Sequence, residues 1–316
     1  MNPTIYNVRI LIILKISEVS DVADFQLTSC STTDLSHEYF EKRNIGVKFF
    51  HFELGGKDYL DDMGKSVPPE ELFRRMLAGE DTKTSQITMG EYIEFFEPYL
   101  QAGQDVLHIA FSSGLSGSYN SARLAAEELA PKYPDRKLYV IDSLAASTGH
   151  GLVLDKAADL RDEGKSIEEV RDWIEANKNR AQHWFFSSDL TFYIRGGRVS
   201  KTAGTIGMVL GICPLLNVND EGKLIPREKI RGKKRVEKRI VEVMEQHAEN
   251  GLDYTGKVFI SNSACYEDAR AVADIIEEKF TKMNGKVEIY SIGATIGSHT
   301  GPGTVALFYW GDERTR

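Results

Sequence analysis

The sequence predicts an α/β protein of two domains, the first with a mainly parallel sheet and the second a mixed α/β unit. Strand-like and helix-like segments alternate between residues 25 and 180, which is the order of a parallel sheet with crossover helices. The near-continuous apolar run 106–111 is typical of a strand buried on both faces. A length of 316 residues exceeds one ordinary core and suits two domains of about 150 residues each.

The elements of the first half follow from apolar periodicity and from helix-start signals. Pro68 and Pro69 open a helix, because proline is tolerated in a first turn. The acids Glu70 and Glu71 suit the positive end of that helix. The other expected elements are strands at 25–28, 47–52, 106–111 and 138–141, and helices at 89–100, 119–129, 144–161 and 167–177.

The second half departs from the strand–helix alternation of the first half. It contains a predicted hairpin of strands 215–218 and 223–225 around the turn 219–222. We place the domain boundary near Arg180. This gives an extension over 1–24, a first domain over 25–180 and a second over 181–316. The remaining elements expected here are strands at 184–186, 258–260, 287–292 and 304–309, and helices at 190–194, 233–249 and 266–280.

Composition excludes several classes of function. A formal charge of −8 argues against a nucleic-acid partner, because binding phosphates needs a basic surface. No run approaches the roughly 18–20 apolar residues of a membrane span. The three cysteines are far apart and form no CxxC pair, so we expect buried thiols in a reducing cytoplasm and no cysteine metal site.

Familiar catalytic motifs are incomplete. The triplets Gly-Lys-Ser at 164–166 and 64–66 match the end of a phosphate-binding loop. That loop also needs a glycine five positions earlier, where this sequence has Asp159 and Tyr59. The segment 114–118 resembles a nucleophile elbow, but its last position is Ser118 instead of glycine. No histidine pair has HExxH spacing. Redox, metal and nucleotide-cleaving functions therefore have no motif.

Two segments suggest a binding site instead. The hydroxyl-rich loop 112–118 follows a buried strand and precedes a helix, which is where open α/β sheets bind ligands. The glycine-rich segment 292–303 surrounds a single histidine, His299, and its glycines allow close backbone approach. The alternative for the serines and threonines is helix capping.

Four motifs follow one another along the chain, namely Thr84-Ser85-Gln86, Ser112–Tyr119, Gly196–Ser200 and His299–Gly303. Together they resemble the DegV family of fatty-acid-binding proteins, and residues 31–36 resemble the opening motif of that family. The resemblance covers nearly everything from Phe25 onward. Cys30 stands where the family usually has aspartate.

The resemblance implies a cytoplasmic bacterial carrier that binds one long-chain fatty acid and presents it to a separate fatty acid kinase, with no cofactor, no metal and no chemistry of its own. The carboxylate would be bound by Thr84, Ser116 and His299 at the interface between the domains. The neighbouring loop residues expected to support it are Ser85, Ser113, Gly117, Thr300 and Gly301.

The acyl chain and the partner surface are expected elsewhere. Residues 223–239 contain nine basic residues against two acids, which suggests docking to a kinase or transient contact with an anionic lipid surface. Arg198 and Arg231 are the candidates for partner contact. The apolar tunnel is expected among Ile206, Met208, Val209, Leu210 and Ile212.

Two other functions remain open at this point. A serine acyl hydrolase would use Ser116 as nucleophile and His299 as base, with Asp34 or Asp142 orienting the imidazole. A sugar- or phosphate-binding regulatory module would use the amides at the helix start, although the apolar segment 202–212 argues against so polar a ligand.

Overall fold

The first sheet is parallel, as the sequence predicts, with the strand order β2-β1-β6-β7. The computed structural model describes residues 25–200 and 211–316. The strands are β1 (Phe25–Cys30), β2 (Gly46–Lys48), β6 (Asp105–Ala110) and β7 (Leu138–Asp142).

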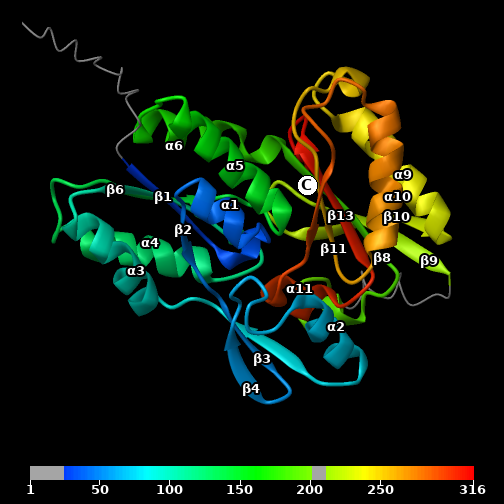
Figure 1. Ribbon diagram of the computed structural model, residues 1–316, viewed down its shortest axis with the longest axis horizontal. Helices are drawn as coiled ribbons and strands as arrows, with labels where there is room; N and C mark the ends of the chain where they lie inside the picture. Colours follow the sequence, from blue (N-terminus) through cyan, green and yellow to red (C-terminus); the bar gives the residue numbers. More distant parts are fainter. Residues whose placement is uncertain (1–24, 201–210) are drawn as a thin grey trace, which may run out of the picture.

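Helices cover both faces of this sheet. On one face lie α3 (Met89–Gln101) and α4 (Ser118–Leu129), which bury Phe96 and Leu129 against the strands (Figure 1). Helix α3 begins where expected because Thr88 and Glu91 form a reciprocal capping box. The other face carries the helices α1 (His37–Lys42), α5 (Thr148–Asp162) and α6 (Ile167–Asn177).

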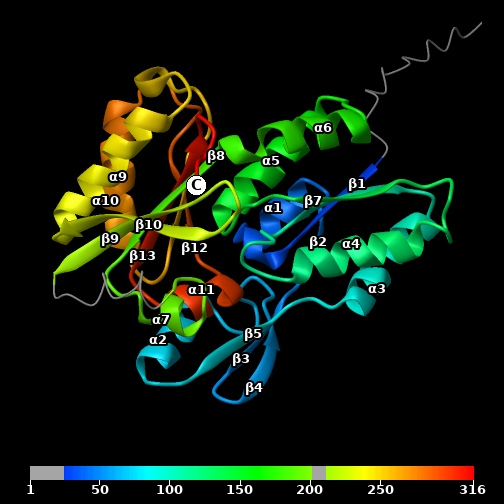
Figure 2. The ribbon, with the colours of Figure 1, turned by 180° about the vertical axis from the view of Figure 1, so that it is seen from behind.

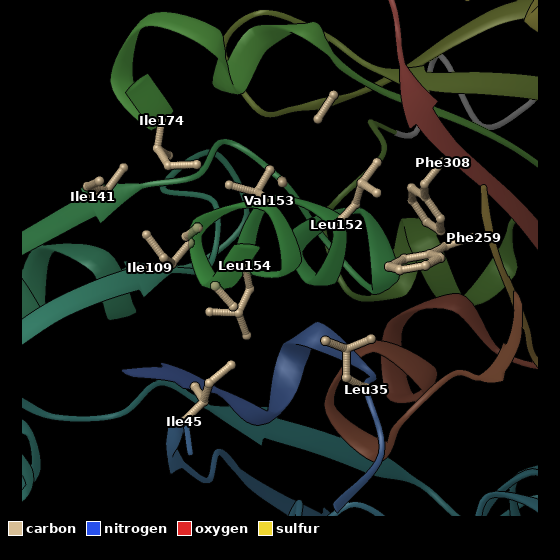
Figure 3. Packing of buried hydrophobic residues seen from close by; sticks show 14 of the residues in the cluster. Leu35, Ile45, Ile109, Ile141, Leu152, Val153, Leu154, Ile174, Phe259 and Phe308 are labelled. Carbon is tan, nitrogen blue, oxygen red and sulfur yellow. The ribbon is translucent and has the colours of Figure 1, made fainter. Parts of the chain in front are cut away.

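Helix α5 joins the two halves of the molecule. Twelve of its fifteen residues are buried, which is expected of a helix packed on all sides. Figure 3 shows Leu152, Val153 and Leu154 between Ile109 of the first sheet and Phe308 of the second. The two halves therefore share one continuous core, and the boundary near Arg180 stays a prediction.

The second sheet is mixed and has the order β10-β9-β8-β13-β11-β12, with only β11 and β12 parallel. Helices α9 (Lys233–His247) and α10 (Tyr266–Lys279) cover its outer face (Figures 1 and 2). The predicted hairpin is the pair β9 and β10. The strands are β8 (Ala181–Ser187), β9 (Ile212–Val218), β10 (Leu224–Arg231), β11 (Phe259–Asn262), β12 (Glu288–Ser291) and β13 (Thr304–Trp310).

A small antiparallel sheet with the order β4-β3-β5 corrects the single strand expected over 47–52. The chain leaves the first sheet after Lys48, because Phe50 is buried under the first sheet while Phe52 packs in a separate cluster. The elements of this region are β3 (His51–Leu54), β4 (Lys57–Leu60), β5 (Thr82–Ser85) and α2 (Pro69–Leu77).

The glycine-rich segment 292–303 contains a short helix, α11 (Ala294–Thr300), that its composition does not predict. Gly297 lets this helix approach α2, since a Cβ there would lie 3.0 Å from Phe73 Cζ. The remaining short elements are α7 (Thr191–Arg195) and the 3-10 turns η1 (Ser31–Thr33), η2 (Lys178–Arg180) and η4 (Gly251–Asp253).

Candidate functional site

A cavity of about 330 Å³ lies where the small sheet, α11 and the second sheet meet. This volume is at the lower end of the roughly 300–1,000 Å³ typical of small-molecule sites. Both halves of the chain supply its walls. Gly117 lines the cavity together with the polar residues Thr84, Ser85, Gln86, Ser116, Ser147, His183, Tyr193, Arg198, Thr295, His299, Thr300 and Thr304.

Thr84 and His299 are in direct contact there, although 215 positions separate them in the chain. Thr84 Oγ1 lies 2.7 Å from His299 Nε2. Strand β5 holds Thr84 in register opposite Phe52 of β3, and α11 carries His299. Ser116 lines the same cavity. The structure thus gathers at one cavity the three residues that the sequence proposed for the head group.

The imidazole of His299 is neutral at pH 7. Burial, with a smaller effect from the positive charge of Arg198, lowers the pKa of His299 to about 4. A neutral imidazole has one N–H, so either His299 or the Thr84 hydroxyl donates in their shared hydrogen bond. His299 Nδ1 is buried and has no hydrogen-bond partner among the described residues. Whichever tautomer is present, the pair therefore keeps one donor that no described residue uses.

Close backbone approach explains the glycines beside this histidine. A Cβ on Gly196 would lie 2.3 Å from His299 Nδ1, so a larger residue there would displace the ring. Gly301 has a φ of +64°, and a Cβ on it would lie 2.2 Å from Phe192 Cδ2. Gly301 is absent from the cavity wall, and its role is to let the chain turn after α11.

The hydroxyl-rich loop combines capping with ligand access. Ser116 Oγ accepts a hydrogen bond from the backbone N–H of Ser118 at 3.2 Å, so capping accounts for one of its lone pairs. Ser112 Oγ donates to the carbonyl of Gly222 at 2.9 Å, which fixes the loop against the β9–β10 turn. Ser113 is exposed and does not line the cavity.

Arg198 lies in the cavity wall and is half-buried. Its guanidinium donates to the carbonyl of Gly196 at 2.5 Å and to that of Leu115 at 3.1 Å. Arg198 thereby ties the turn before it to the hydroxyl-rich loop. Arg231 is exposed at the end of β10 and does not line the cavity.

The apolar part of the wall combines four phenylalanines with aliphatic side chains, and the sequence analysis missed it. The expected tunnel residues Ile206, Met208, Val209 and Leu210 lie outside the described residues. Ile212 starts β9, is half-buried and does not line this cavity. A usable signal was the placement of phenylalanines in or beside buried strands. The apolar lining comprises Phe50, Phe111, Leu115, Ala146, Phe185, Val218, Leu224, Ile292, Ile296, Ala306 and Phe308.

The groups that a serine hydrolase needs are not connected in the described residues. No hydrogen bond joins Ser116 to His299. Asp34 accepts hydrogen bonds from Gly293 and Ser147, and Asp142 accepts them from backbone amides beside it. Neither acid orients the imidazole of His299, so the geometry favours binding over acyl transfer.

The described residues offer neither a metal site nor a membrane-spanning helix. Across residues 25–200 and 211–316, no group of three His, Cys, Asp or Glu side chains is placed to hold a metal ion. Within the same ranges, none of the helices combines the length and the apolar character needed to cross a bilayer.

Comparison with known proteins gives a consistent result. The family model described as an uncharacterised protein of the DegV family matches residues 25–312. A DegV domain-containing protein of Clostridium perfringens is 37% identical over 290 residues, covering 92% of this chain and 98% of the relative.

Two solved structures show the same fold. A fatty-acid-binding DegV family protein from Thermus thermophilus has a TM-score of 0.80 at 26% identity, covering 92% of this chain and 100% of the other. The fatty acid kinase B3 protein (Fak B3) of Streptococcus pneumoniae, loaded with linoleic acid, has a TM-score of 0.78 at 23% identity, covering 91% and 99%. By sequence and by fold, this chain belongs to the DegV family.

Proposed function

We propose that this protein binds one long-chain fatty acid in the cytoplasm and presents it to a fatty acid kinase. The supporting observation is the contact of Thr84 with His299 at a cavity that is also lined by phenylalanines and aliphatic side chains. The fatty acid bound by the Thermus thermophilus relative and the linoleic acid in Fak B3 favour this ligand class.

The carboxylate lies at Thr84, Ser116 and His299 in this proposal. Each hydrogen bond to a charged carboxylate contributes about 1.5–3 kcal/mol. Without such donors a buried carboxylate would be costly or would take up a proton. The unused donor of the Thr84–His299 pair and the Ser116 hydroxyl meet this need.

The acyl chain supplies most of the affinity. Burial contributes about 0.8 kcal/mol per methylene, or roughly 10 kcal/mol for a sixteen-carbon chain. Association and ordering remove about 4 kcal/mol or more. The phenylalanines at 50, 111, 185 and 308 give the chain an apolar surface to contact.

The kinase partner is proposed from the name of Fak B3 and from the basic run 223–239. Within that run Lys229, Arg231, Arg235 and Lys238 are exposed, near the end of β10 and the start of α9. This surface suits an acidic protein face or, transiently, anionic lipid head groups. The carrier itself performs no chemistry in this scheme, and Arg198 would act at the rim of the cavity.

Native mass spectrometry of the protein purified from a heterologous host tests the proposal. A carrier retains one fatty acid of several hundred daltons, and a ligand-free spectrum after delipidation and reloading would refute it. Turnover of a chromogenic acyl ester that disappears in Ser116→Ala would support the hydrolase instead.

A further inference from the structure

Two buried carboxylates hold the amino end of the helix that carries His299. Asp61, which is 2% exposed, follows β4, and its two oxygens accept hydrogen bonds from the backbone N–H groups of Ala294 and Thr295 at 3.2 and 3.1 Å. Both amides belong to the first turn of α11, where helix N–H groups have no partner within the helix.

Asp34 completes this contact from the loop after β1. Its Oδ1 accepts from the backbone N–H of Gly293 at 3.0 Å, and its Oδ2 accepts from Ser147 Oγ at 2.5 Å. A Cβ on Gly293 would lie 2.8 Å from Asp34 Oδ1, so the glycine permits this approach. Ser147 also lines the cavity, so the same network reaches the proposed acyl site.

Helix α11 has little stability of its own. It has seven residues, and isolated helices below about 12–15 residues are marginal in water. His299 lies five residues after Ala294, a rise of about 7–8 Å. A shift at the amino end of so short a helix is therefore transmitted directly to the imidazole.

We propose that Asp34 and Asp61 are positioning residues for His299, because together they fix α11 in the place that brings the imidazole to Thr84. The role extends the proposed function, on which it depends only for the identity of the ligand. It also gives the opening motif 31–36 a task, since Asp34 belongs to it.

The surroundings of the two carboxylates agree with this role. No Lys, Arg or His lines the small pocket beside them, and the titratable groups that face them are Cys30 and Tyr290. Burial, and for Asp34 also the negative charge of Asp61, raises the pKa of both acids. Backbone amides and hydroxyl groups counter this effect, from Ser147 and Gly293 at Asp34 and from Thr295, Ala294 and Ser31 at Asp61.

The two acids are predicted to differ in their tolerance of asparagine. In Asp34→Asn, the amide oxygen still accepts from Gly293 while the amide nitrogen donates to Ser147, whose hydroxyl turns to Ser261 at 2.9 Å. In Asp61→Asn, one of the two helix amides faces an NH₂ group and loses its acceptor.

The test is an NMR titration of the His299 ring in the delipidated full-length protein. The groups beside the ring are Arg198 from the loop after α7 and Thr84 from β5. We expect a midpoint near 4 in the parent and in Asp34→Asn. In Asp61→Asn the midpoint should rise by at least one pH unit toward the ordinary 6.5, because the ring gains solvent. Reloaded with palmitate, Asp61→Asn should retain it at least tenfold more weakly.

Ser166→Ala is the matched control, because it removes the capping hydroxyl of α6 and lowers stability without touching α11. Gly293→Ala provides a second variant if Asp61→Asn does not fold, and it should raise the midpoint similarly. An unchanged midpoint in folded Asp61→Asn or Gly293→Ala, or the same rise in Ser166→Ala, would overturn the proposal. Failure of the parent to retain any fatty acid would instead refute the proposed function, since the titration needs no ligand.

Discussion

Among the described residues, a threonine hydroxyl pairs with an imidazole in two places. In the first sheet, Thr28 Oγ1 lies 3.0 Å from His108 Nδ1, and at the cavity Thr84 Oγ1 lies 2.7 Å from His299 Nε2. Burial lowers the pKa of His108 to about 3 and that of His299 to about 4. In each ring the second nitrogen has no hydrogen-bond partner among the described residues.

The surroundings separate the two pairs. His108 is fully buried, and the rings of Tyr92 and Phe96 pack edge-on against it with centroids 5.3 and 5.2 Å away. It lines no described cavity, whereas His299 lines one of about 330 Å³. A histidine paired with a threonine is therefore not itself a sign of function. Whether the pair lies at a cavity decides whether it can serve a ligand.

The largest expected effect is at the cavity. Thr84→Ala combined with Ser116→Ala removes two hydroxyl groups proposed to bind the carboxylate, worth about 3–6 kcal/mol together. We expect fatty-acid retention to fall by roughly a hundredfold or more while the fold is kept. Isothermal titration of the delipidated protein with palmitate, beside a circular dichroism spectrum, measures both.

Ser113→Ala is the control for this double variant. Ser113 belongs to the same hydroxyl-rich loop but is exposed and outside the cavity wall. Its loss should change retention by less than about twofold, as for an ordinary surface substitution. Unaltered retention in the double variant would contradict the head-group assignment.

The next effect is at the structural pair. His108→Ala leaves a space among aromatic rings and removes one of the two hydrogen-bond partners of the Thr28 hydroxyl, at a cost of about 3 kcal/mol of unfolding free energy. Fatty-acid affinity should stay within about twofold of the parent, because His108 does not reach the cavity. Urea denaturation and palmitate titration check the two halves of this expectation, and a large loss of affinity would erase the contrast with His299.

Sequence reasoning predicted the parts of the fold that depend on local pattern. The parallel sheet follows from the apolar run 106–111, and the hairpin follows from the turn at 219–222. It missed α11, because glycines in that segment favour a loop by composition while close packing against α2 is what requires them. The break after Lys48 was also missed, since Phe50 and Phe52 choose different cores only in three dimensions.

The candidate site was predictable in its polar half only. The motifs containing Thr84, Ser116 and His299 carry a family resemblance, and the structure places all three at one cavity. The aromatic wall comes from separate strands with no shared motif, so no local signal assigns Phe185 and Phe308 to a ligand. Asp34 was considered as part of the opening motif 31–36 and as a catalytic acid, but not as a partner of α11, because its contact with Gly293 spans 259 positions.

A pH dependence of stability sharpens the comparison further. A histidine whose pKa is lowered in the folded state binds its proton more readily when unfolded. The contribution of such a histidine to the free energy of unfolding is therefore fully present above about pH 6.5. It falls by about 1.4 kcal/mol per pH unit as the pH drops toward the pKa of the histidine in the folded state. For His108 the window is pH 6.5 to about 3, and for His299 it is pH 6.5 to about 4.

Bound fatty acid should alter only one of these contributions. A carboxylate beside His299 favours the protonated ring and raises its pKa, so loading should flatten the contribution of His299 between pH 6.5 and 4. His108, enclosed by aromatic rings, should keep its full slope. Urea denaturation at pH 6.5, 5.5 and 4.5 of the parent, His108→Phe and His299→Gln, each with and without palmitate, separates the two. If palmitate changes the slope in His299→Gln as much as in the parent, the carboxylate does not lie beside His299, and the two pairs no longer differ in function.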